Sequence, residues 1–153
     1  RYRNDNEVAS QWAAFVPHRD DDDENGVYFL TPLMPVDPVT RAQFRLALFR
    51  IETDWYTLLD ELECGVDKRV SKAAKLLRES IIAADPLFEA APFFLSEEFS
   101  LVDCTIAPVL WRLPVYGIEL GKDASPIEDY MERVFERRSF QQSLTELERE
   151  MRM

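Results

Sequence analysis

The feature that most constrains the fold of this chain is a serine followed three residues later by an aspartate, immediately before a long apolar run. Ser100 and Asp103 fit a helix-capping box, in which the serine hydroxyl pairs with the aspartate amide and the aspartate carboxylate pairs with the serine amide. Aspartate is a shorter variant of the usual glutamate or glutamine, and Phe99 stands at the staple position. The pattern predicts that a helix begins at Leu101.

This predicted helix, from Leu101 to Leu113, is apolar on nearly every side, which is typical of a central and buried helix. Pro108 lies inside it and is expected to bend it or to leave a carbonyl unpaired, because proline has no amide hydrogen. Pro114 is expected to end the helix. We therefore expect an all-α helical bundle of roughly five helices, with this one at its centre.

A long helix is expected upstream, from Pro38 to about Cys64. Asp37 suits the N-cap, Pro38 suits the first helical position, and Gly65 suits the position after the last turn. The apolar positions recur every three or four residues, as on one face of a helix. They are Phe44, Leu48, Ile51, Trp55, Leu58 and Leu62.

A second helix is expected from about Asp67 to Ala84, with Pro86 stopping it. Its apolar stripe consists of Val70, Ala74, Leu77, Ile81 and Ala84. The apolar stretch 88–95 is expected to be a connection, because Pro92 disfavours a continuous helix there.

After the buried helix, Ser125 is expected to be the N-cap and Pro126 the first residue of an amphipathic helix. Apolar residues continue at helical spacing into a last, more polar helix at Phe140, Leu144, Leu147 and Met151. No convincing alternating strand pattern follows residue 32. The residues expected to be largely buried are Phe44, Leu48, Trp55, Leu77, Ile81, Ile106, Leu110, Tyr130, Val134 and Phe135.

The first part of the chain differs from the rest. Residues 1–32 contain the run 20–24 of five acidic side chains, which repel one another and resist packing. A short helix around Trp12, ended by Pro17, and a short strand remnant at 27–30 are the only elements expected there. We expect residues 1–32 to be a divergent, acidic, poorly ordered segment and 33–153 to form the helical domain.

Composition excludes several function classes. Hydrophobic residues make up 46% of the chain, which is enough for a core. A net charge of −11 disfavours direct binding to DNA or RNA. No apolar run reaches the roughly 18–20 residues of a membrane helix, and no signal peptide is visible. The two cysteines, Cys64 and Cys104, suggest no disulfide framework, so we expect a reducing, cytoplasmic location.

No chemistry of an enzyme is visible in the sequence. The only histidine, His18, lies in the acidic first segment, so neither a transition-metal site nor a catalytic triad is expected. The nucleotide, P-loop, nucleophile-elbow and metalloprotease motifs are absent. Adjacent carboxylates such as Glu97 and Glu98 point apart on a helix and are better explained as solvated surface. We expect no catalytic, cofactor-binding or metal-binding residues and no cofactor.

Several segments of the sequence together point to a known family: 32–36, 50–58, 94–104, 110–114, 130–137, 143–146 and 148–152. They resemble the stringent starvation protein A family, whose helical half belongs to the glutathione-transferase fold. Two motifs are specific to that family: Trp111-Arg112-Leu113-Pro114 and the run Asp-Trp-Tyr-Thr-Leu at 54–58. The capping box alone would indicate only the broader fold.

The resemblance implies a bacterial cytoplasmic transcription regulator that associates with RNA polymerase holoenzyme in starvation and stress, forms homodimers and is not an active transferase. In that family a thioredoxin-like domain precedes the helices, and residues 1–28 do not resemble it. The family also carries a Pro-His-Pro motif, implicated in its regulatory contact, just before the segment 32–36. Phe29, Leu30 and Thr31 stand at the corresponding positions here, and only the following Pro32 matches. Alternative functions are a glutathione-dependent transferase fragment and a helical dimerisation module without independent function.

The same resemblance places a dimer contact on the long first helix. Because Phe44, Leu48 and Trp55 are needed in the core, the contact is expected on the outer face of that helix. The candidate partner-binding residues are Pro32, Arg41, Arg45, Glu52 and Tyr56.

Overall fold

The computed structural model describes residues 32–65, 67–121 and 124–152, and within these ranges the chain is helical. No strand occurs in this part of the chain, where pairing of the β type is limited to an isolated bridge between Phe93 and Ser96. The prediction of an all-α fold is confirmed. The expected helix around Trp12, the strand remnant at 27–30, the acidic run at 20–24 and His18 lie outside the described residues.

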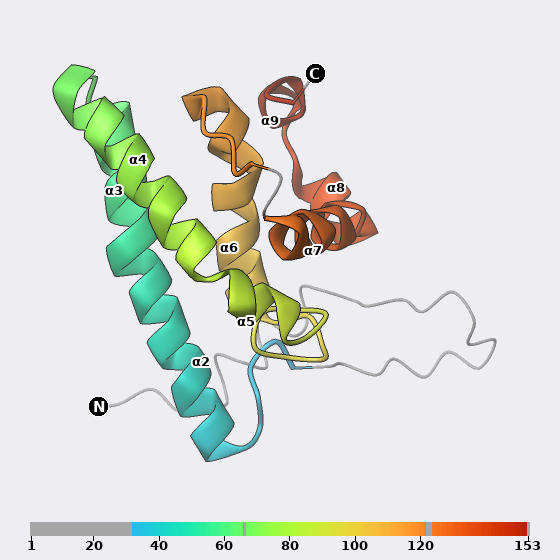
Figure 1. Ribbon diagram of the computed structural model, residues 1–153. Helices are drawn as coiled ribbons and strands as arrows, with labels where there is room; N and C mark the ends of the chain where they lie inside the picture. Colours follow the sequence, from blue (N-terminus) through green and yellow to red (C-terminus); the bar gives the residue numbers. More distant parts are fainter. Residues whose placement is uncertain (1–31, 66, 122–123, 153) are drawn as a thin grey trace, which may run out of the picture.

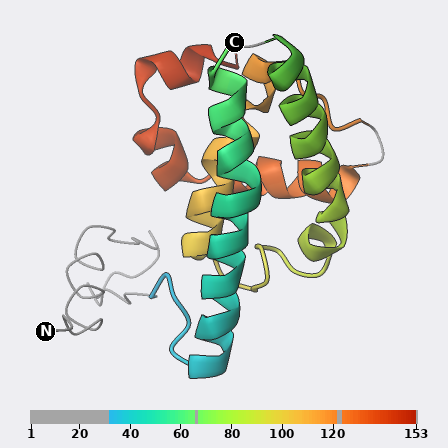
Figure 2. The ribbon, with the colours of Figure 1, turned by 90° about the vertical axis from the view of Figure 1, so that its left-hand side faces the viewer.

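The elements pack in three groups (Figure 1). Their bounds are α2 Pro38–Ile51, the π-helical turn η1 Glu52–Tyr56, α3 Thr57–Glu63, α4 Asp67–Ala83, α5 Asp85–Glu89, α6 Leu101–Arg112, the 3-10 turn η2 Leu113–Tyr116, α7 Ser125–Phe135, α8 Arg138–Ser143 and α9 Glu146–Glu150. The segments α2, η1 and α3 form one continuous rod, and α4 runs back beside α3. Helix α6 stands between this pair and the group α7–α9. Figure 2 shows the rod along the front of the molecule with α6 behind it.

Both ends of the rod follow the sequence signals. The Asp37 carboxylate accepts a hydrogen bond from the Thr40 amide at 2.8 Å, and Pro38 occupies the first turn, so α2 begins where predicted. The chain leaves α3 at Cys64 and passes through Gly65, whose φ of 71° lies in the left-handed region that glycine adopts without strain.

Helix α6 is the centre of the bundle, as predicted. Its buried residues are Val102, Asp103, Ile106, Ala107, Val109 and Leu110. The capping box is present, with the Ser100 amide donating to Asp103 Oδ2 at 2.8 Å, while the Ser100 hydroxyl also accepts from the Val102 amide at 3.2 Å. The helix continues through Pro108, and Pro114 marks the change to η2. The predicted core residues are buried except Leu48, which is half-buried.

Three predicted details are wrong. Ser125 is the first residue of α7 and not its N-cap, because the buried Ala124 already accepts from the Glu128 amide and occupies the cap position. The stretch 88–95 is not wholly a connection, since it overlaps α5, which begins at Asp85, has Pro86 in its first turn and includes Phe88. The last helix is divided into α8 and α9, because Leu144 is extended and Thr145 opens a second capping box with Glu148.

Candidate functional site

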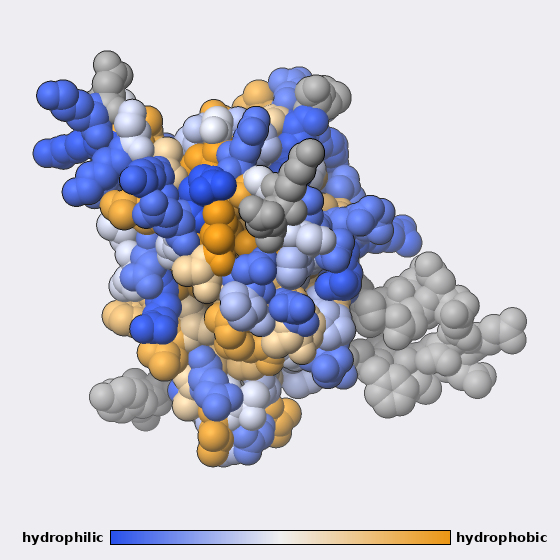
Figure 3. All heavy atoms as spheres, viewed as in Figure 1, coloured by the Kyte–Doolittle hydropathy of each residue, from blue (hydrophilic) through white to orange (hydrophobic). Residues whose placement is uncertain are grey.

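Helix α2 is apolar on two opposite faces. Its inner face buries Phe44 and Ile51 in the core, with 2% and 4% of their surface exposed. The opposite face carries Val39, Leu46 and Phe49, which are 68%, 59% and 62% exposed. These three residues are seven and three positions apart and therefore share one side of the helix. We call them the outer stripe, and Figure 3 shows apolar surface along this edge of the molecule.

The outer stripe is not covered by any of the described residues. Burial of its side chains away from water would be energetically favourable. Large apolar side chains are often exposed singly, but three in one row on one helix form an unusual surface for a monomer. Ala42 and Thr53 lie in the same row and are exposed. Small residues in a row allow another backbone to approach closely. The arrangement suits a contact with a second protein surface.

The sequence carried the signal for this stripe. Val39, Leu46 and Phe49 recur at helical spacing, out of phase with the core positions Phe44 and Ile51. The predicted contact lay on the outer face of this helix but was assigned to Arg41, Arg45, Glu52 and Tyr56, and the second apolar set was not recognised. A helix with two apolar faces would have been recognised by counting both periodic sets.

The structure brings together only some of the predicted partner-binding residues. Arg45 and Glu52 are exposed and flank the outer stripe on one side of the rod. Pro32 is exposed at the start of the described chain, well before the stripe in sequence. A role for these residues in binding a partner stays a prediction.

Arg41 and Tyr56 are engaged within the chain. The Arg41 guanidinium donates to the carbonyls of Pro35 and Val36 at 2.8 and 2.7 Å, so it holds the incoming segment against α2. The Tyr56 hydroxyl donates to the carbonyl of Thr105 on α6 at 2.9 Å. Burial raises the pKa of the Tyr56 phenol above its ordinary value. These two side chains connect elements of the bundle.

The other predicted pair, Ser100 and Asp103, forms a structural centre. The fully buried Asp103 accepts four hydrogen bonds. Its Oδ1 pairs with the Phe94 amide at 2.9 Å and the Tyr130 hydroxyl at 2.7 Å, and its Oδ2 pairs with the Ser100 amide and hydroxyl at 2.8 and 3.0 Å. Burial and the neighbouring carboxylate raise the pKa of Tyr130. Since every Asp103 oxygen is satisfied, this carboxylate joins α6, α7 and the segment before α6 and is not free to act on a ligand.

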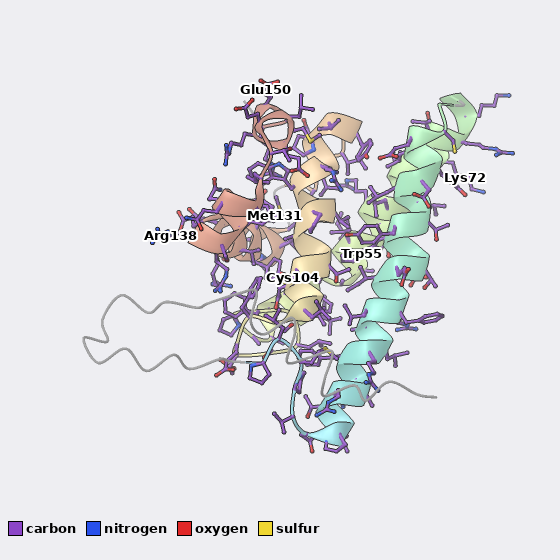
Figure 4. All side chains as sticks on the ribbon, turned by 180° about the vertical axis from the view of Figure 1, so that it is seen from behind. Trp55, Lys72, Cys104, Met131, Arg138 and Glu150 are labelled. Atoms are coloured by element: carbon purple, nitrogen blue, oxygen red, sulfur yellow. The ribbon has the colours of Figure 1, made fainter. Side chains whose placement is uncertain are left out.

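The described residues show no reactive centre. Cys104 lies on α6 and Trp55 points from the rod toward the interior (Figure 4). Part of the Cys104 side chain reaches solvent, yet desolvation raises the pKa of its thiol to about 11, which disfavours the reactive thiolate. Within the described ranges no group of three or more histidine, cysteine, aspartate or glutamate side chains is placed to hold a metal ion. No helix in these ranges is both long and apolar enough to cross a membrane.

Comparison with known proteins agrees with the fold. The family model described as "Glutathione S-transferase, C-terminal domain" matches residues 46–138, which is more than half of the chain.

Similar curated proteins carry the name stringent starvation protein A homolog. The protein of Pasteurella multocida (strain Pm70) is 54% identical over 114 residues, covering 74% of this chain and 54% of the relative. That of Histophilus somni is 49% identical, covering 76% and 55%, and that of Coxiella burnetii (strain RSA 493 / Nine Mile phase I) is 39% identical, covering 79% and 58%. The chain thus spans just over half the length of these relatives. It belongs to the family of glutathione S-transferase C-terminal domains, and within that family it is similar to the stringent starvation protein A homologues.

Proposed function

We propose that this chain is the helical part of a non-enzymatic transcription regulator of the stringent starvation protein A type, acting in the cytoplasm by binding other proteins. The observation that carries the proposal is the outer stripe of Val39, Leu46 and Phe49 on α2. A solvent-exposed apolar row, on a helix whose other face is already packed in the core, is typical of a protein–protein contact. The described residues offer no catalytic arrangement that competes with this function.

The first partner that we propose is a second copy of the chain. A helix that presents the same row to its two-fold mate makes a self-complementary contact, and symmetric dimers are the commonest assemblies of soluble proteins. The centre of the row, Leu46 and Phe49, would lie nearest the two-fold axis. Arg45 and Glu52 carry opposite charges at the flank and would form the polar rim.

The second proposed partner is RNA polymerase holoenzyme, during starvation and stress. This proposal rests on the similarity to the stringent starvation protein A homologues. The region around Pro32 is the candidate contact, because the resemblance implies a regulatory contact at the Pro-His-Pro motif and Pro32 is the matching residue next to it. Retention of the chain by immobilised holoenzyme tests this, and loss of retention on Pro32→Ala would support the assigned contact.

Sedimentation equilibrium at micromolar concentration tests the self-association. We expect the wild-type chain to be dimeric and Leu46→Arg to be monomeric, because an arginine in the middle of the row would bury an unpaired charge. Leu147→Arg is the matched control, since Leu147 is 73% exposed on α9, far from α2 along the chain and in Figure 1. A wild-type monomer at this concentration, or a dimer that survives Leu46→Arg, would contradict the proposed contact.

The alternative of a glutathione-dependent transferase fragment is tested separately. We expect titration calorimetry to show no saturable binding of glutathione, because glutathione in the transferase fold is held mainly by the thioredoxin-like half, whereas the family model matched here is that of the C-terminal domain. Saturable binding would favour the transferase alternative. A stable dimer that binds neither glutathione nor holoenzyme would favour a dimerisation module without independent function.

A further inference from the structure

The C-terminal end of α6 lacks the hydrogen-bond donors that would continue a helix. The carbonyl of Leu110 would ordinarily accept from the amide four residues later, but that residue is Pro114, which has no amide hydrogen. A side chain from the far end of the chain replaces it. Arg152 Nη2 donates to the Leu110 carbonyl and Arg152 Nε donates to the Trp111 carbonyl, each at 3.0 Å.

Aromatic rings surround the same guanidinium. The Arg152 Cζ lies 4.9 Å from the centre of the Trp111 ring and 4.7 Å from the centre of the Phe135 ring. These two rings meet edge to face at 5.0 Å, and Phe140 packs against both, at 5.3 and 5.1 Å. Ring faces and carbonyl oxygens both suit a guanidinium, because each presents partial negative charge to a flat cation. The site is therefore built for an arginine side chain.

A second contact holds the rest of the C-terminal segment. Trp111 Nε1 donates to the carbonyl of Glu148 at 2.8 Å, and Arg112 Nη2 lies 3.2 Å from Glu148 Oε1. Trp111 thus contributes its ring face, its indole N–H and its carbonyl to these contacts, and Arg112 contributes its guanidinium. The fourth residue of the motif 111–114, Pro114, leaves the Leu110 carbonyl free to accept from Arg152. Every one of these polar groups is directed at α9 or Arg152.

A further polar contact of α9 with the rest of the described residues is a hydrogen bond from Arg149 Nη2 to the Gln141 carbonyl on α8, at 3.2 Å. It contains no buried residue, and Leu147 on it is largely exposed. The preceding Leu144 is buried and extended, so it is the last buried apolar residue in the part of the chain that the structure describes, and it lies just before α9. An element with few buried apolar contacts opens at low free-energy cost compared with the core. In Figure 1, α9 lies at the edge of the molecule beside the end of α6.

We propose that the end of α6 and the rings of Trp111 and Phe135 form a guanidinium-binding site, and that α9 with Arg152 is its detachable internal ligand. Release of α9 pivots at Leu144 and Thr145 and leaves the core packed. The released site then takes an arginine side chain from another source in place of Arg152. This inference is independent of the proposed function, because it involves neither the outer stripe nor Pro32.

We call the attachment of α9 through Arg152 the latch. Three variants of the full chain test it. Arg152→Ala removes the guanidinium, Arg152→Lys keeps the charge without the planar fork, and Arg149→Ala is the control. Arg149 is an exposed arginine of α9, close to Arg152 in sequence, and its side chain donates one hydrogen bond of 3.2 Å to the Gln141 carbonyl. Hydrogen exchange of the α9 amides is compared with that of α7, and 5-fluorotryptophan labelling reports on Trp111, whose fluorine signal is assigned with Trp111→Phe.

We expect Arg152→Ala to accelerate exchange in α9 about tenfold or more while α7 stays protected, and to shift the Trp111 signal. Arg152→Lys should give the same changes in smaller degree, and Arg149→Ala should resemble wild type. Unchanged α9 exchange in Arg152→Ala would overturn the latch. Global unfolding of Arg152→Ala would also overturn it, since the latch requires that α9 detaches from an intact core.

Chemical rescue tests the ligand class. N-acetylarginine amide, added to Arg152→Ala at concentrations on the order of millimolar, should return the Trp111 signal toward its wild-type position in a saturable manner. N-acetyllysine amide should not, because it lacks the flat guanidinium. Equal responses to both compounds, or no saturable response to the arginine compound, would overturn the assignment of a guanidinium site.

Discussion

At the scale of single residues, Asp103 connects three parts of this bundle: α6, α7 and the segment before α6. It is a fully buried carboxylate with four donors, drawn from Ser100, Phe94 and Tyr130. The sequence indicated its bond to Ser100 because the capping box is a local pattern. It gave no sign of Phe94 and Tyr130, because those contacts depend on tertiary packing. The role of Asp103 is therefore larger than a helix cap.

This difference leads to a prediction about stability. Ser100→Ala removes an N-cap acceptor and should lower the free energy of unfolding by about 1 kcal/mol. Asp103→Ala leaves several buried donors without an acceptor and should cost about 3 kcal/mol or more. Urea denaturation of both single variants and the double variant measures these values. The double variant should lose less than the sum, and strict additivity would contradict a shared network.

A second residue-scale prediction concerns pH. The Thr145 amide and hydroxyl, together with Arg112, lower the pKa of Glu148 below its ordinary value. A pKa that is lower in the folded state gives stabilisation that is present above the unfolded value of about 4.3 and is lost as the pH falls through the folded value. We expect the protection factors of the α9 amides, which correct each rate for the intrinsic pH dependence of exchange, to fall below about pH 4 in the wild type. Glu148→Gln should have low protection factors in α9 already at neutral pH, with little further change on acidification.

At the scale of elements, local signals predicted the ends of helices where the cap is a single side chain or glycine. Asp37, Ser100 and Gly65 are examples. The capping box of Thr145 and Glu148 also matches a local sequence pattern. It was not predicted, because the spacing of Leu144 and Leu147 fits a continuous helix. Helix α7 begins without a side-chain cap, so no local pattern marked Ala124. Periodicity predicts which face is buried better than it predicts where a helix is interrupted.

No local sequence pattern predicted the π-helical turn η1. Its side chains contact two different helices. Within it, Trp55 is buried and its Nε1 donates to Ser80 Oγ on α4 at 2.9 Å, while the adjacent Tyr56 reaches α6. An ordinary α-helix separates adjacent side chains by about 100°. A single wider turn changes that separation and lets two neighbours contact different helices, which is a common use of π turns.

The bond between Trp55 and Ser80 gives an element-scale prediction. Trp55→Phe removes the donor and some buried surface, and Ser80→Ala removes the acceptor and leaves the indole N–H unsatisfied. We expect each change to cost about 1–3 kcal/mol in thermal or urea unfolding. The double variant should show coupling of about 0.5 kcal/mol or more. Independent effects would mean that the bond does not help to hold η1 against α4.

At the scale of the whole molecule, composition and surface give different information. The net charge of −11 excludes few folds but does affect association, because two copies of this chain repel each other. For the candidate site, the sequence predicted the helix that carries it, α2, and the residue at which that helix begins. The outer stripe needed the structure, since only the packing of α6 against α2 shows which apolar face is covered and which is left in water.

These opposing terms predict how the proposed dimer responds to salt. Burial of Leu46 and Phe49 favours association and is little affected by moderate salt, whereas the repulsion between two acidic chains is screened within about 10 Å at 0.1 M salt. Rim pairs between Arg45 and Glu52 would weaken with salt, but exposed ion pairs contribute little. We therefore expect the dimer dissociation constant to fall several-fold between about 0.05 and 0.5 M sodium chloride. Sedimentation equilibrium at both salt concentrations measures this, and a dimer that weakens with salt would show that ion pairs and not the apolar stripe hold it together.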